Sequence, residues 1–247
     1  MKRQLHRRSD SLARHHALLV ALSEDLALPL VQIKTGLELM QDANFAKPLA
    51  RQQTRAMNLS VEAGFQLIEA YRLLLASDQL VSFDFQPVSI GAVLEEVAHG
   101  LTPFAQEYST KLEVDIQGRL TPVLVHQPSL TAAMQALGFS LIRAQAAQSE
   151  RAEYRLILGA HRTVDNVIAA GAFSDVQGLS DRSLRAAHSL VGQARQPLPS
   201  VPPGTASGIL VADMLCANLW QPLRSAAHKS LGGLATTLPT SKQLQFV

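Results

Sequence analysis

The sequence predicts an α+β protein in which a helical hairpin precedes a domain of helices packed on a sheet. Two observations carry this prediction. Apolar residues recur at spacings of three and four along two long N-terminal segments, whereas from about residue 83 short apolar stretches alternate with helical ones. With 247 residues and 47% hydrophobic content, the chain can bury a core as one larger domain or two small ones. We expect two domains, 1–82 and 83–247.

The first long segment has the period of an amphipathic helix with a coiled-coil-like seam. Pro29 lies inside this segment and predicts a kink, because proline removes one backbone hydrogen bond at a cost of about 3 kcal/mol unless packing compensates. Residues 42–48 break the period and predict the turn of the hairpin. The apolar positions of the seam are Leu19, Leu22, Leu26, Ile33, Leu37 and Met40, with Leu30 widening it.

A second helix is predicted from about residue 49 to 76. Two such helices expose more apolar surface than a lone hairpin can bury, so we expect two copies to pair into a four-helix bundle. The alternative is that the apolar stripe packs on the rest of the same chain. The residues expected in the homodimer interface are Leu19, Leu22, Leu26, Ile33, Leu37, Met57, Leu67 and Ile68.

The remaining chain predicts alternating helices and strands. Ser129 is the expected N-cap of the helix at 128–148. The strands at 154–162 and 163–173 have no long spacer between them, which favours an antiparallel hairpin. The other predicted elements are helices at 90–108, 181–194 and 207–220, strands at 111–116 and 122–126 flanking a turn at 117–119, a proline-rich loop at 196–204, and a strand pair around 232–233.

Composition excludes several classes of protein. A net charge of +2 gives no strong field for nucleic acid, and the basic N-terminal end is interpreted as a solvated terminus. The single cysteine, Cys216, excludes an internal disulfide and favours the cytoplasm. Because Glu24 and Asp25 interrupt the first apolar stretch, no run is expected to reach the roughly 18 apolar residues of a membrane span, and no targeting segment is expected.

The segment Ser23 to Leu30, SEDLALPL, resembles the S-H-E-L-R-T-P-L motif of sensor histidine kinases, and the order of elements resembles their catalytic core from about residue 14 to 239. The position of the phosphate-accepting histidine is Glu24, followed by Asp25 at the position of the assisting acid. A carboxylate cannot replace the imidazole nucleophile that stores phosphate. His15 and His16 lie eight or nine residues earlier, at a different height of the bundle.

The second domain resembles the Bergerat ATP-binding domain of the same family. Along its asparagine-rich helix, Ala136 and Ser140 stand at the two asparagine positions and Arg143 at the lysine position, and a serine hydroxyl is a poorer magnesium ligand than an amide. In the loops that would hold nucleotide, Gln177 and Leu179 replace glycines. No cofactor is therefore expected. If ATP and magnesium were still bound, the resemblance implies that Asp175, Gly204, Thr205 and Gly208 would hold the nucleotide.

The resemblance thus implies a catalytically inactive histidine-kinase-like protein, a cytoplasmic homodimer that regulates a response regulator, a kinase or a phosphotransferase. The alternatives are a divergent ATP-binding kinase or phosphotransferase with residual activity, a phosphotransfer protein that lacks ATP binding, and an unrelated nucleic-acid binder. The phosphotransfer alternative is disfavoured because the bundle has no histidine at the expected place. The exposed positions on which a partner is expected to dock are Val31, Gln32, Thr35, Glu38, Ala70 and Leu74.

Overall fold

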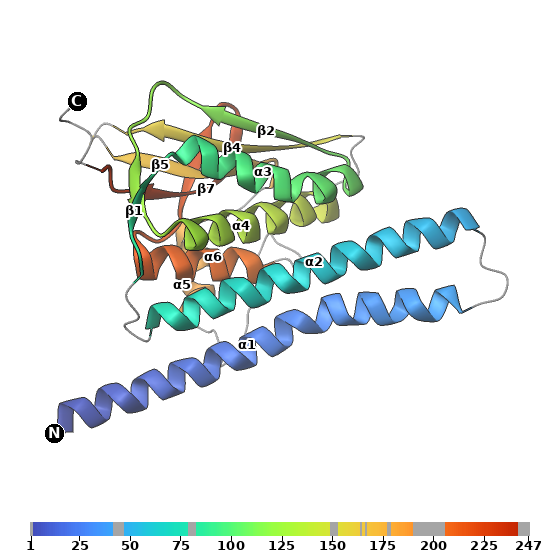
Figure 1. The fold of residues 1–247 in the computed structure, drawn as a ribbon, viewed down its shortest axis with the longest axis horizontal. Coiled ribbons are helices and arrows are strands. Elements are labelled where there is room, and N and C mark those ends of the chain that lie inside the picture. Colours follow the sequence, from blue (N-terminus) through green and yellow to red (C-terminus); the bar gives the residue numbers. More distant parts are fainter. Residues whose placement is uncertain are drawn as a thin grey trace.

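The computed structural model describes residues 2–41, 47–78, 83–148, 153–163, 165, 167–176, 179–189 and 206–241, and the side chains of the first helix from His16 onward. Three layers follow one another in Figure 1: a mixed sheet, a layer of helices on one face of it, and a long helical hairpin beneath those helices. The α+β class and the N-terminal hairpin predicted from the sequence are confirmed. The boundary expected at residues 82 and 83 stays a prediction.

The hairpin consists of α1 (Lys2–Met40) and α2 (Lys47–Asp78). The first helix begins at Lys2, well before Leu19, the first apolar position of the predicted seam. Its early turns are polar, so the apolar period did not reveal them. It continues through Pro29, which is buried. Close contacts between the two helices use small residues: Leu26 of α1 packs near Gly64 of α2, and Met57 of α2 covers Gly36 of α1.

One segment of α1, His16–Met40, is long and apolar enough to cross a bilayer by length and composition. The expectation that no stretch meets this criterion is therefore wrong. The acidic pair Glu24 and Asp25 lies within the segment, yet its mean hydropathy over the best window is 1.4. This evidence for a membrane span is weak, since the core helix of a soluble protein and a signal sequence pass the same test.

The second helix is buried against the helix layer. Its residues Ala63, Ala70, Tyr71 and Leu74 are 3% exposed or less, and they belong to one hydrophobic core with α3 (Ile90–Glu107), α4 (Gln127–Gln148) and α6 (Ala206–Leu219). In Figure 1, α2 runs along the underside of α4 and α6. This part of the apolar stripe thus packs on the same chain, which was the alternative to pairing with a second copy.

The main sheet has the strand order β2-β4-β5-β7-β6. Its single parallel pair joins β2 to β4, and the other pairs are antiparallel, including the predicted β4–β5 hairpin. A second, two-stranded sheet pairs β1 with β3 and lies at one end of the helix layer. The strand bounds are β1 Gln86–Val88, β2 Thr110–Ile116, β3 Val123–Val125, β4 Tyr154–Arg162, β5 Ile168–Ser174, β6 Arg224–His228 and β7 Leu231–Leu238.

Several local predictions need correction. Ser129 is not an N-cap: α4 already begins at Gln127, and the buried Ser129 hydroxyl lies 2.8 Å from His126 Nδ1. The fifth strand begins at Ile168 rather than at residue 163. The predicted closing strand pair is confirmed as β6 and β7, but glycines 232 and 233 lie inside β7, because the chain reverses earlier, at Lys229 with φ 53°. The helix α5 is described over Asp181–Ser189, and the predicted proline-rich loop lies outside the described residues.

The tip of the β6–β7 hairpin reaches across the outer face of the sheet. The His228 ring stacks on Phe173, with centroids 4.9 Å apart, and its Nε2 donates to Asp115 Oδ2 at 2.6 Å. Lys229 Nζ lies 3.1 Å from the same carboxylate oxygen. A Cβ on Gly159 would approach the His228 ring to 3.0 Å, so this glycine leaves room for the ring. The contact joins the β6–β7 hairpin to β2, the strand at the opposite edge of the sheet.

The hydrogen bond from His228, followed by that from Lys229, holds the pKa of Asp115 below its ordinary value. A carboxyl whose folded pKa is depressed stabilises the fold above its unfolded pKa, and this contribution is lost as the pH falls through the folded value. We therefore expect Asp115→Asn to lower the free energy of unfolding by about 1–2 kcal/mol at pH 7, and this deficit to narrow below about pH 4.

Urea unfolding of both chains across this pH range measures the deficit. A matched control is Glu113→Gln on the same strand. Its partners Lys111 and Arg155 are both far more exposed than His228, so the loss of this carboxylate should cost less than about 1 kcal/mol. An Asp115→Asn deficit of the same size at pH 3 and pH 7 would contradict the assignment.

Candidate functional site

Several of the positions compared with the family motifs meet where the hairpin faces the helix layer, although Glu24, at the phosphoacceptor position, is not among them. Asp25 of α1, Gln66 of α2, Ser140 of α4 and Gly208 of α6 line one cavity of about 20 Å³. A cavity of this size accommodates about one water molecule. Its lining includes Gln66 Oε1, a buried acceptor without a hydrogen-bond partner in the structure, which suits a bridging water.

The expected metal-binding positions are covered by α6. Ser140 and Ala136 are 3% and 4% exposed, and a Cβ on Gly208 would collide with the Ser140 hydroxyl and approach the Ala136 carbonyl oxygen to 2.6 Å. Glycine at 208 therefore lets α6 approach α4 until their backbones nearly touch. The described residues at this site do not fit a magnesium ion and its phosphates, because helix packing occupies the space beside Ser140.

The two acids at the phosphoacceptor motif have different surroundings. Glu24 is exposed, whereas the half-buried Asp25 accepts a hydrogen bond of 2.6 Å from the hydroxyl of Tyr71. Because Tyr71 is fully buried on α2, this bond fixes α1 to α2. The side chain of His16 is exposed, and that of His15 lies outside the described side chains. Asp25 thus has a positioning role that the motif comparison did not predict.

The remaining nucleotide positions are only partly described. Asp175 follows β5 and is half-buried, while Gly204 and Thr205 lie outside the described residues. A further acid, Asp213 on α6, is buried and accepts the backbone N–H of Leu223 at 2.8 Å. The neighbouring Cys216 is completely buried, and burial raises the pKa of its thiol.

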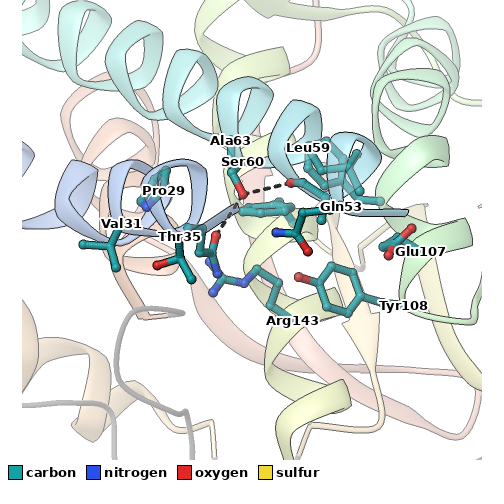
Figure 2. A pocket seen from close by; sticks show the side chains of 14 residues that line it. Pro29, Val31, Thr35, Gln53, Leu59, Ser60, Ala63, Glu107, Tyr108 and Arg143 are labelled. Atoms are coloured by element: carbon teal, nitrogen blue, oxygen red, sulfur yellow. Dashed lines mark hydrogen bonds between the residues drawn. The ribbon is translucent and has the colours of Figure 1, made fainter. Parts of the chain in front are cut away.

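A larger groove of about 370 Å³ lies beside this cavity (Figure 2). It is bounded by both hairpin helices, by the C-terminal end of α3 and by α4. Three of the expected docking residues on α1, namely Val31, Gln32 and Thr35, line it. Together with Glu38 they are exposed, with Val31 at 57%. The groove therefore opens onto the face of α1 on which a partner was expected.

The expectation that two of the docking residues on α2 are exposed is wrong. Ala70 and Leu74 are 0% and 1% exposed, because this face of α2 packs into the shared core.

Within the groove, Ser60 donates to Gln32 Oε1 at 3.0 Å, and Glu107 at the end of α3 lies 3.4 Å from Arg55 Nε. Sequence reasoning did not bring Tyr108, Gln53 and Arg143 together, because they come from three separate helical segments.

The residues expected in a homodimer interface separate into two groups. Met57 and Leu67 are 9% and 8% exposed within one chain, so they are not available to a second copy. Leu19, Leu37 and Ile68 are 52%, 51% and 43% exposed. Leu22, Leu26 and Ile33 are half-buried. A pairing surface on the hairpin must therefore use the exposed residues rather than the whole predicted set.

Solved histidine kinase structures share this fold. ThkA in complex with the response regulator TrrA matches with a TM-score of 0.57 and 8% identity, over 99% of this chain and 67% of that chain. Full-length ShkA in complex with AMPPNP matches with 0.54 and 11% identity, over 94% and 46%. AdeS of Acinetobacter baumannii matches with 0.51 and 15%, over 89% and 98%.

At these identities the likeness shows the fold alone, and the chain has the fold of a histidine kinase catalytic core. It spans less than half the length of ShkA. No protein-family model matches the chain. No curated protein matches it by sequence.

The packing of α6 on α4 predicts that restoring an asparagine will not restore metal binding. We expect Ser140→Asn to lower the free energy of unfolding by about 1–3 kcal/mol, because the larger amide has no room beside Gly208. Thermal melting of this variant and of the natural chain should be unchanged by millimolar magnesium-ATP, whereas a ligand at about 100 times its dissociation constant would add about 2.7 kcal/mol.

The control is Ala147→Asn on an exposed position of the same helix, which should cost only the helix propensity, about 0.5 kcal/mol. A magnesium-ATP-dependent rise in the melting temperature of Ser140→Asn would show that the site can reopen.

Proposed function

We propose that this chain is a catalytically inactive histidine-kinase-like protein that acts in two-component signalling by binding a partner. The observation that carries the proposal is the packing of Gly208 against Ala136 and Ser140, which fills the space that a metal and its phosphates need. The motif at the first helix supports it as well, since its acceptor position is an exposed carboxylate, Glu24. Binding requires only shape and surface, which the fold still supplies.

The proposed partner is the receiver domain of a response regulator. Its docking surface is the exposed face of α1 formed by Val31, Gln32, Thr35 and Glu38. This face is continuous with the groove against α3 and α4, so a partner seated there would touch both the hairpin and the α/β domain. ThkA was solved bound to a response regulator, and a related fold makes the same class of partner a reasonable choice here. Kinases and phosphotransferases are the other partners to be tested.

We expect Val31→Glu to weaken binding to a cognate receiver domain about tenfold or more, because it places an unpaired charge in the proposed interface. Titration calorimetry with receiver domains encoded in the same genome measures the effect. The matched control is Leu124→Glu, which introduces the same charge at an exposed apolar position of β3, 38% exposed and outside both the docking face and the hairpin. Equal losses in the two variants would reject this docking face.

The catalytic part of the proposal has its own test. Incubation of the purified chain with γ-labelled magnesium-ATP should leave no label on the protein. Label that is stable in base and lost in acid would identify a phosphohistidine, and it would favour the alternative of a divergent active kinase.

We further propose that two copies pair through the exposed apolar residues of the hairpin. Leu19 and Leu37 lie 18 residues apart on α1, so a partner helix can cover both. We expect Leu19→Glu combined with Leu37→Glu to convert the dimer to a monomer in light scattering, without loss of helical signal in circular dichroism. The combination of Glu62→Gln and Glu95→Gln, two exposed acids outside this surface, is the control. A natural chain that is monomeric at high micromolar concentration would contradict the proposal.

A further inference from the structure

The groove between the hairpin and the α/β domain contains the positive charge of Arg143, which contacts an aromatic ring. Arg143 is half-buried on α4, and its guanidinium carbon lies 5.5 Å from the centroid of the Phe139 ring. Within the part of the chain that the structure describes, this guanidinium has neither a hydrogen-bond acceptor nor an acidic partner. A guanidinium presents five N–H donors in a planar fork that matches the oxygens of a carboxylate or phosphate.

Other unpaired donors converge on the same space. Figure 2 shows the Tyr108 hydroxyl and the Gln53 carboxamide pointing toward the Arg143 guanidinium, with Thr35 at the side of α1. Among the described residues, none of these side chains has a hydrogen-bond partner. The acid on the lining, Glu107, lies near Arg55, which balances its charge. The centre of the groove is therefore rich in donors and favours an anion.

The walls of the groove are apolar. Phe104 and Phe139 meet edge to face with their centroids 4.5 Å apart, and Pro29, Leu59 and Ala63 complete the hairpin side. A volume of about 370 Å³ lies within the range of small-molecule sites, roughly 300–1,000 Å³. Such sites combine mostly apolar walls with a few polar groups that fix the orientation of the ligand.

We propose that this groove binds a small amphipathic oxyanion. Its apolar body, of about two fused rings, would lie against Phe104 and Phe139, and its carboxylate or phosphate would bind Arg143 with Tyr108 and Gln53. Such a ligand touches both helices of the hairpin and two helices of the α/β domain, so its binding holds the two parts together. The inference does not depend on the proposed function, because a chain that binds no receiver domain can still have this site.

The probes are 2-naphthoate, 2-naphthyl phosphate and the uncharged 2-naphthamide, which share one ring system and differ in the polar group. Titration calorimetry with the full chain should give at least one anion a dissociation constant about tenfold lower than that of the amide, as expected for a charge-assisted pair. Tighter binding of the carboxylate or of the phosphate identifies which oxyanion the site prefers.

Arg143→Gln should abolish the preference for the anions, whereas Arg162→Gln, which removes the same charge from an exposed position of β4, should keep it. Thr35→Phe leaves Arg143 in place but narrows the groove from the exposed side of α1, and it should weaken binding of all three probes. Equal binding of the anions and the amide, no binding of any probe, a preference that survives Arg143→Gln, or binding unaffected by Thr35→Phe would each overturn the proposal.

Discussion

The burial of α2 against α4 and α6 determines the rest of the structure. Residues such as Tyr71 and Leu74 are removed from water on contact with the helix layer, and burial of a large apolar side chain contributes about 1.5–3 kcal/mol. Since the same helix also packs on α1, the hairpin and the α/β domain share one core. The relative placement of the phosphoacceptor motif and the asparagine-equivalent positions is therefore a property of the folded core.

This shared core brings together positions that lie far apart in the sequence and at which the chain differs from the histidine kinase motifs. Asp25 accepts a hydrogen bond from Tyr71, and Ser140 packs against Gly208. Asp25, Ser140 and Gly208 line the same small cavity. Asp25 and Ser140, at the positions of the assisting acid and of one asparagine, lie at helix contacts here, whereas Glu24 at the acceptor position is exposed. The open groove adjoins this closed region, and Arg143 and Phe139 line both.

The sequence was informative where a long period or a buried strand determined the structure. The hairpin, the α4 helix and the β4–β5 pair follow from apolar spacing alone, because each buries a continuous stripe. The strand β1 was not predicted because three residues with one buried side chain give no usable period. The early turns of α1 were missed for a related reason, since a polar helix has no apolar face to detect.

Burial partners were harder to predict than elements. The periodicity of α2 marks Leu74 as part of an apolar face, but it cannot say whether another chain or α6 covers that face. The groove was inaccessible to sequence reasoning because Gln53, Tyr108 and Arg143 become neighbours only through packing of α2, α3 and α4. The one sequence observation on Arg143 was its alignment with the family's lysine position. That alignment suggested nucleotide binding and not a place in an open groove.

The position of β7 in the sheet bears on the order in which the chain acquires its structure. It is the last of the described strands along the sequence, yet it lies inside the sheet, between β5 and β6. During synthesis on the ribosome, β5 must therefore wait with one edge unpaired while more than fifty further residues are added. An unpaired edge made of buried, apolar residues invites pairing with other chains. Chaperone binding to the nascent chain is best suited to this interval.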